Sequence, residues 1–324
     1  MREMASTALA HKSEASVPAR RRPGPLARAE RRAFYLFIGP WIIGFIVFSA
    51  GPILAAGYFS FTNLTDLDLH HLPQFVGLDQ YNQLLSDRFF WLSLRVTAIY
   101  TGLSVPINIV AALAIAILLN QKIPGLRAFR TIYYMPTVVA GVASALLWSQ
   151  LLRKDDGLLN WMLSLARLGP IDWIGDGGWA MVTLLLYNAW YLGSGMVIFL
   201  AALQAVPSAL YEAAQIDGAS AVSRFWHISL PQISPVILFN AVIGLINSLQ
   251  IFIPPLVITG KGGPAFATYV YGLNLFDRAF TDTQAGHGGY TSAMSWVLFM
   301  VALVLTAVFF QVSKDIVYYE SGTA

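Results

Sequence analysis

Six long apolar runs constrain this chain more than any other feature of its sequence. A helix needs about 20 apolar residues to cross the hydrocarbon core of a bilayer, and each run has that length or more. The composition, 56% hydrophobic and only 11% charged, excludes an ordinary soluble domain. The sequence therefore predicts an all-α integral membrane protein with six transmembrane helices. They cover residues 33–61, 92–119, 131–151, 179–204, 234–259 and 291–313.

The charged residues predict how these helices are oriented. If the N-terminus is cytoplasmic, 13 of the 20 Lys and Arg residues lie on the cytoplasmic side, and 10 of the 17 acidic residues lie on the other side. Because cytoplasmic loops are enriched in Lys and Arg, we expect a multi-pass protein with both termini in the cytoplasm. The net charge of +3 thus reflects the sides of a membrane and does not indicate a nucleic-acid partner.

The chain reads as one folded domain with a tail at each end. Residues 1–32 are polar, rich in Arg and Ala, and without apolar periodicity, so we expect a disordered cytoplasmic tail. It is either a simple charged retention tail or a tether for lipid headgroups or a partner. Residues 33–315 form the transmembrane domain, in contact with membrane lipid, and residues 316–324 form a cytoplasmic C-terminal tail.

A polar segment, residues 207–233, separates the fourth and fifth apolar runs. We expect a short helix over Ser208–Asp217 that stops at Gly218, since glycine readily takes the left-handed conformation. Ser220 is suited to cap a second short helix, which we expect Pro231 to end. The product is a helix-turn-helix elbow at the cytoplasmic membrane surface.

The elbow has a distinctive spacing. Glu212-Ala213-Ala214 is followed after three residues by Gly218, and after nine more by Ile228-Ser229-Leu230-Pro231. This resembles the EAA loop of the membrane subunits of bacterial ABC importers, which docks into a cleft on a separate ATPase subunit. The resemblance implies an ABC importer permease fold. It also implies that the coupling residues are Glu212, Ala213, Ala214, Asp217, Gly218, Ile228, Leu230 and Pro231. The alternative is a structural elbow without a partner.

Other segments resemble the carbohydrate branch of that family, and in particular its first permease, the maltose- or glycerol-phosphate-type subunit. They are Leu210-Tyr211, Ile216 to Ala219, Pro235, Gly262 to Pro264, Thr268, Ala279-Phe280 and Gly289 to Ser295. The resemblance implies a bacterial inner-membrane permease that translocates a mono-, di- or oligosaccharide delivered by an extracytoplasmic binding protein. It implies as partners a second homologous permease and two copies of an ABC ATPase, which use ATP and Mg. This chain itself would bind no cofactor.

No catalytic grouping of side chains is evident in the sequence. The five histidines lack metal-ligand spacing, there is no cysteine, and Gly260 to Gly263 lacks the flanking residues of a phosphate-binding loop. Only Arg95 lies inside an expected span, so no proton relay is apparent. We therefore expect no enzyme, no metal and an external source of energy. The alternative transport class is an ATPase-independent secondary carrier or channel for a small polar solute.

Polar side chains within the fourth and fifth runs are candidates for the substrate path. An amide in the bilayer is costly unless it faces a cavity or a partner group, and aromatic and amide side chains suit a sugar. In the maltose-type relative, sugar contacts lie on these two spans. By distance from Glu212, the positions that match are Tyr187, Trp190, Tyr191, Ser194, Asn247 and Ser248. The polar residues Asn188 and Gln250 of the same two runs complete the set of candidates. The alternative is that they pack helix against helix.

Tryptophans mark the outer end of the third and fourth runs. Trp161, Trp173 and Trp179 occur where an interfacial aromatic belt is expected, beside an amphipathic stretch over Leu158–Leu168. We interpret them as interfacial anchors; stacking on sugar rings is the alternative.

Overall fold

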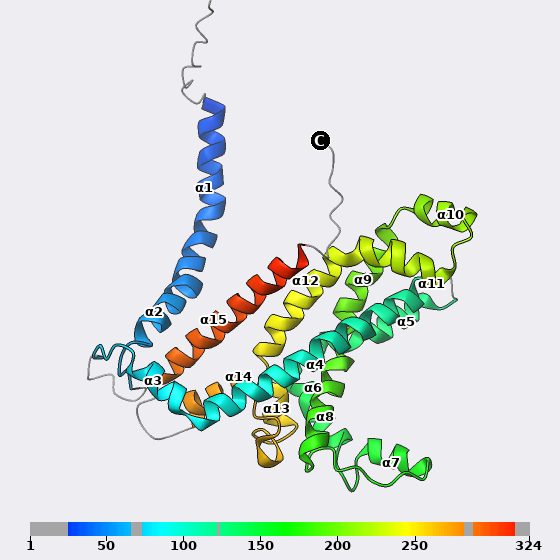
Figure 1. Ribbon diagram of the computed structural model, residues 1–324. Helices are drawn as coiled ribbons and strands as arrows, with labels where there is room; N and C mark the ends of the chain where they lie inside the picture. The colour runs from blue at the N-terminus through cyan, green and yellow to red at the C-terminus, as the bar shows by residue number, and fades with distance from the viewer. Residues whose placement is uncertain (1–24, 66–72, 122–123, 282–287, 315–324) are drawn as a thin grey trace, which may run out of the picture. The chain divides into compact units, whose positions relative to one another are not determined.

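The computed structural model describes residues 25–65, 73–121, 124–281 and 288–314 (Figure 1). Within these ranges the regular structure is helical, with one isolated antiparallel bridge between Thr62 and Phe75. The all-α prediction is confirmed. The chain divides into two compact units, one up to Ala55 and one from Ala56 onward.

The α-helices follow one another in chain order with short connections. They are α1 (Pro25–Phe45), α2 (Gly51–Phe59), α3 (Asp79–Ser86), α4 (Arg88–Leu119), α5 (Leu126–Tyr134), α6 (Gly141–Leu151), α7 (Leu158–Leu165), α8 (Gly177–Trp190), α9 (Gly193–Ala205), α10 (Ser208–Ile216), α11 (Ala221–Arg224), α12 (Leu230–Leu249), α13 (Ile253–Val257), α14 (Tyr271–Phe276) and α15 (Gly288–Ser313).

The first unit corrects the expected tail boundary. Helix α1 begins at Pro25, so residues 25–32 are helical and not part of a disordered tail. Proline is favoured in the first turn of a helix, and the Leu, Ala, Arg and Glu residues that follow it are good helix formers. The rest of that tail, residues 1–24, and the expected C-terminal tail, 316–324, lie outside the described residues.

Four described helical segments are long and apolar enough to cross a membrane. They are Ala33–Phe59, Arg88–Leu119, Ala221–Val257 and Gly288–Ser313. They match the first, second, fifth and sixth expected spans. The other two expected spans are each a pair of helices with a sharp bend, so the described residues provide six spans if each bent pair counts as one.

The prediction that the third span, residues 131–151, is a single helix is wrong. After α5 a short 3₁₀-helix, Met135–Val138, leads into Val139 and Ala140, which have extended backbone with ψ of 132° and 133°. Helix α6 then continues at 103° to the first part. Pro136 removes one helical hydrogen bond, and the β-branched residues after it favour extended backbone.

The fourth expected span bends by 48° between α8 and α9. Helix α9 begins at Gly193, where an added Cβ would lie only 2.3 Å from the carbonyl oxygen of Tyr133. The start of α9 therefore touches the backbone at the end of α5, and only glycine fits there. The two broken spans meet at their breaks.

The long helix α4 is central to the second unit and packs against α8, α9, α12 and α14. Small side chains on α4, Ala112 and Ala116, are fully buried against Met196 and Phe199 of α9 and Ile233 of α12. Small residues allow close approach of helices where burial from water supplies no driving force.

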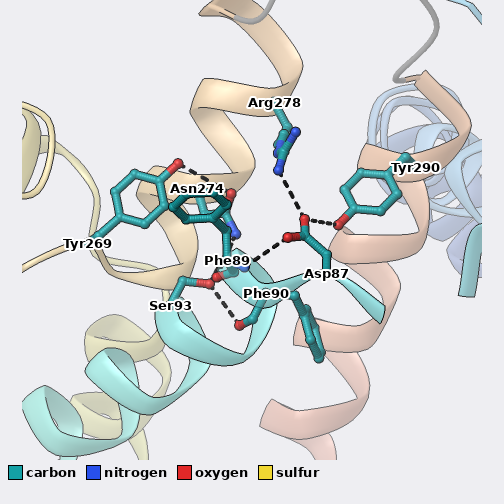
Figure 2. Close-up of polar contacts among 8 residues, drawn as sticks. All are labelled: Asp87, Phe89, Phe90, Ser93, Tyr269, Asn274, Arg278 and Tyr290. Carbon is teal, nitrogen blue, oxygen red and sulfur yellow. Dashed lines mark hydrogen bonds and ion pairs between the residues drawn. The ribbon is translucent and has the colours of Figure 1, made fainter. Parts of the chain in front are cut away.

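One carboxylate joins three elements at the end of α4 that is remote from the elbow (Figure 2). The Oδ1 atom of Asp87 accepts a hydrogen bond from the backbone N–H of Phe89 at 2.8 Å and so caps α4. Its Oδ2 atom accepts from Arg278 at 3.0 Å and from the hydroxyl of Tyr290, at the start of α15, at 2.8 Å. The side chains of Asp87 and Arg278 are only 16% and 24% exposed.

Asn274 of α14 strengthens this junction beside Asp87 (Figure 2). Its amide nitrogen donates to the carbonyl of Phe89 at 3.2 Å and to the hydroxyl oxygen of Ser93 at 3.1 Å. The hydroxyl of Tyr269 donates to its amide oxygen at 3.3 Å. Helix α14 and the segment after it are thus joined to the starts of α4 and α15 by polar contacts that are largely shielded from water.

We predict that Asp87→Asn lowers the stability of the purified protein by roughly 1–3 kcal/mol, because it removes the charge from a shielded ion pair but leaves an oxygen that can cap α4. The measurement is the midpoint of thermal unfolding. The matched control is Asp156→Asn, because its partner Arg153 lies 2.9 Å away in a pair that is more than half exposed. That change should cost less than about 1 kcal/mol. Equal effects of the two changes would contradict the prediction.

Candidate functional site

The elbow forms as the sequence predicts up to its second arm. Gly218 has φ of +75°, its N–H donates to Gln215 O at 3.1 Å, and the N–H of Ala219 donates to Ala214 O at 2.9 Å. This pair of bonds is a Schellman ending of α10. Ser220 accepts from the N–H of Ser223 at 3.2 Å and caps α11. Both local predictions are confirmed.

The expectation that Pro231 ends the second arm is wrong. A π-turn, Phe225–Ser229, connects α11 directly to α12, and the N–H of Leu230 donates to Phe225 O, five residues back. The wider turn displaces the carbonyls that the proline ring would otherwise meet, so the helix continues through Pro231. The same arrangement, a π-turn over Ile46–Ala50, precedes Pro52 in the first span.

The expected coupling residues fall into two groups on the elbow. Glu212, Ala213, Asp217 and Gly218 are exposed, and Ala214 is half-buried. Ile228, Leu230 and Pro231 are half-buried in the second arm. The hydroxyl groups of Tyr211 and Ser229 lie 2.9 Å apart and join the two arms. The first group is free to contact a partner, and the second group belongs to the continuous helix.

Sequence reasoning left one prominent elbow residue out of the site. Ile216 is 88% exposed, between the exposed Glu212 and Gly218, and Val222 and Trp226 of the second arm are also exposed. The sequence offered a signal for Ile216, because an isolated large apolar residue stands out in a polar segment. These residues give the elbow an apolar surface that the described part of the chain does not cover.

The second candidate site is a cavity of about 650 Å³ among α4, α8, α9, α12 and the breaks of the bent spans. It is lined by Tyr100, Ser104, Val105, Asn108, Ile109, Ala112, Tyr134, Thr137, Asn188, Tyr191, Ser194, Gly195, Phe199, Asn240, Ile243, Gly244, Asn247, Ser248, Gln250, Ile251, Phe252, Ile253 and Pro254. This volume is within the range of small-molecule sites, about 300–1,000 Å³.

Six of the eight expected path residues line this cavity: Asn188, Tyr191, Ser194, Asn247, Ser248 and Gln250. Tyr187 and Trp190 are not among the lining residues. The hydroxyl of Tyr187 is 2.9 Å from the hydroxyl oxygen of Ser144 on α6, and the ring of Trp190 lies 5.9 Å from that of Trp148. These two side chains pack against α6, as the helix-packing alternative describes.

Sequence reasoning missed the contribution of α4. Tyr100, Ser104 and Asn108 line the cavity and are four residues apart, so they form a polar stripe on one face of α4. That spacing was visible in the sequence. Tyr134 and Thr137 were not predictable in this way, because the break after α5 brings them to the cavity.

The cavity is polar but uncharged. None of its described lining residues is Asp, Glu, Lys, Arg or His, whereas five carry amide side chains. The Asn108 amide nitrogen donates to Asn188 O at 3.3 Å, and that of Asn240 donates to Val236 O at 2.9 Å, which fixes both side chains. Within the described part of the chain, no group of three His, Asp or Glu residues could hold a metal ion. The site is equipped for hydrogen bonding and stacking, and not for bond chemistry.

Comparison with known proteins gives a consistent result. The family described as "binding-protein-dependent transport system inner membrane component" matches residues 87–316. The probable ABC transporter permease YesP of Bacillus subtilis is 39% identical over 298 residues, which are 91% of this chain and 94% of YesP. The trehalose/maltose permease MalF of Thermococcus litoralis is 34% identical over 288 residues, with 88% and 95% covered. The lactose permease LacF of Rhizobium radiobacter is 32% identical over 287 residues, with 87% and 94% covered.

A solved structure shares the fold. A chain of a bacterial alginate ABC transporter, in complex with an alginate-bound periplasmic protein, superposes with a TM-score of 0.77 at 24% identity, covering 90% of this chain and 98% of that one.

We predict that Gly193→Ala destabilises the protein by about 1–3 kcal/mol, because the new methyl group would meet the Tyr133 carbonyl oxygen at 2.3 Å. Gly195→Ala, in the same helix, is the matched control. Its nearest neighbours, Asn240 Oδ1 and Ala112 Cβ, would be 3.4 and 3.5 Å away. The midpoint of thermal unfolding should fall for the first change and stay nearly constant or rise for the second. A tolerated Gly193→Ala would show that the two breaks are not in backbone contact.

Proposed function

We propose that this chain, which belongs to the family of binding-protein-dependent transport system inner membrane components, carries a neutral sugar through its uncharged cavity. The observation that carries the proposal is the cavity lining, which combines amide and aromatic side chains without a single charged residue.

Family membership confirms the coarser predictions. The chain is an ABC transporter permease subunit, embedded in the inner membrane and not itself an enzyme. An ATPase-independent carrier or channel, the alternative that the sequence left open, is a different class of transport protein from this family. The finer statements, on substrate, coupling and assembly, are proposals.

The sugar proposal has two supports. MalF and LacF, each at least 32% identical to this chain over nearly their whole length, are named as permeases for trehalose or maltose and for lactose. The lining of Asn188, Asn247 and Gln250, beside the rings of Tyr100 and Tyr191, suits the hydroxyl rim and apolar faces of a sugar ring. A neutral solute fits best, because a charged one would enter without a countercharge.

The elbow is proposed as the contact with an ATPase subunit. Its exposed first arm, from Glu212 to Gly218, would dock on that subunit. Its second arm is continuous with α12, which carries Asn240, Asn247 and Ser248 into the cavity. A displacement of the elbow would therefore move one wall of the cavity directly, because no flexible joint intervenes.

The proposed assembly is the one that the sequence predicts. A second homologous permease would complete the path, two ATPase copies would use ATP and Mg, and an extracytoplasmic sugar-binding protein would deliver the solute. Both termini and the elbow would be cytoplasmic. The alginate transporter structure, in complex with a periplasmic protein, is consistent with such an arrangement.

The test of the substrate proposal is sugar uptake by the complete transporter in proteoliposomes. Asn247→Ala removes a hydrogen-bonding group from the cavity and should lower the rate of uptake roughly tenfold, since one lost bond costs about 1–1.5 kcal/mol. Tyr187→Phe is the control, because Tyr187 packs outside the cavity; it should leave uptake within about twofold. A panel of neutral sugars and sugar acids identifies the solute. Preferred uptake of an anionic sugar would contradict the proposal.

The test of the coupling proposal uses Gly218. Gly218→Ala forces a side chain into a backbone conformation with φ of +75°, at a cost of about 1 kcal/mol, although no atom lies within 4 Å of the new methyl group. Gly218→Asn is the matched control, because asparagine tolerates this conformation. The number of solute molecules transported per ATP hydrolysed should fall several-fold for alanine and less for asparagine. Glu212→Lys should weaken binding of the ATPase subunit; unchanged binding and coupling in all three would refute docking at the elbow.

A further inference from the structure

Helix α7 is a separate short element at the end of the α8–α9 pair that is opposite α10 (Figure 1). Its eight residues span only about 12 Å, which is far too short to cross a bilayer. It follows α6 and precedes α8, and both of these belong to bent spans. Since its neighbours enter the membrane, α7 is confined close to the membrane surface.

The exposed side of α7 is an apolar stripe. Leu158, Trp161, Met162 and Leu165 are each between 51% and 67% exposed. At 100° per residue these four positions fall on one face of the helix. We call this face the α7 stripe. Leu168, just beyond the helix, extends it and is 56% exposed.

The opposite side of α7 is fixed to the rest of the protein. Leu159 and Leu163 pack against a buried cluster that includes Trp173. The amide of Asn160, only 6% exposed, donates to Lys154 O and Ile171 O at 2.9 Å, and its oxygen accepts from the indole N–H of Trp173 at 2.9 Å. These bonds set the rotation of α7 about its axis, so the stripe faces outward in a fixed direction.

This network separates the three tryptophans that the sequence groups together. Trp173 is only 6% exposed and its indole N–H is bonded within the protein, so it is not an interfacial anchor. Trp161, by contrast, lies in the α7 stripe and is 58% exposed. Trp179, at the start of α8, is 40% exposed.

Polar groups border α7 on the side away from the stripe. Arg153 pairs with Asp156 at 2.9 Å and Lys154 pairs with Asp172 at 3.3 Å; Asp172 is half-buried and the other three residues are exposed. Backbone N–H donation from Gly175, with a smaller contribution from Lys154, lowers the pKa of Asp172 and so favours its charged form. An apolar face opposite a charged border is the pattern of a helix that lies in a membrane surface.

We propose that α7 is a membrane-surface anchor whose partner is phospholipid, with the α7 stripe buried at the boundary between headgroups and acyl chains. The four large apolar side chains, one of them Trp, supply the burial, and the charged border remains among the headgroups and water. The helices before and after α7 in the chain also expose large apolar side chains, Leu146 and Leu147 on α6 and Val182 and Leu186 on α8. The anchor would hold the adjoining ends of both bent spans at one depth.

The experiment exploits the absence of cysteine from the chain. Met162→Cys and Leu165→Cys place a spin label in the stripe, and Ser164→Cys places one on the exposed polar side of the same helix. Each variant is labelled in the complete transporter, with cysteine-free partner subunits, in nanodiscs of phosphatidylethanolamine and phosphatidylglycerol. Power saturation then compares collisions with oxygen, which concentrates in lipid, and with a water-soluble nickel chelate.

The expected result is high oxygen and low nickel accessibility at positions 162 and 165, and the reverse at 164, whether or not the binding protein is present. Three results would overturn the proposal. High nickel accessibility in the stripe would place it in water, low accessibility to both reagents would place it against another permease, and immobilisation on addition of the binding protein would make it a docking site. Unfolding midpoints verify that the variants are folded. The readout requires no transport, so its failure is distinct from failure of the sugar proposal.

Discussion

The constraint on which the structure depends is that a backbone N–H or carbonyl inside a bilayer has no water to bond. It forces the chain into helices, and it makes every interruption of a helix a special place. The extended residues Val139 and Ala140 and the bend before Gly193 are such interruptions. They occur against each other and beside the polar cavity.

Two prolines lie within helical segments without breaking them. Both Pro52 and Pro231 follow a π-turn that ends two residues earlier, and the helix continues through each of them. At Pro231 this continuity makes the second arm of the elbow and the cavity wall of α12 parts of one continuous helical segment, Ala221–Val257. The elbow and the cavity are thus two ends of a single helix.

Local features were predictable from the sequence and tertiary ones were not. The left-handed ending at Gly218 and the cap at Ser220 depend on residues within a few positions, and uninterrupted apolar runs gave four spans correctly. The bend at Gly193 depends on contact with Tyr133, sixty residues away, which no local pattern encodes. Six predicted residues line the cavity, and three of them are amides, which are informative by themselves in an apolar run. Tyr187 and Trp190 lie outside the cavity, because they pack against α6, and a sequence does not tell which neighbour covers an aromatic side chain.

The uncharged cavity has an electrical consequence. Moving one elementary charge through a membrane potential of 100 mV involves about 2.3 kcal/mol, so a charged solute or a charged gate would link each transport step to the potential. The proposed neutral solute, in a cavity whose described lining residues carry no charge, would cross without that term. Such a pathway would run at the same energetic cost in a fully energised cell and in a depolarised one.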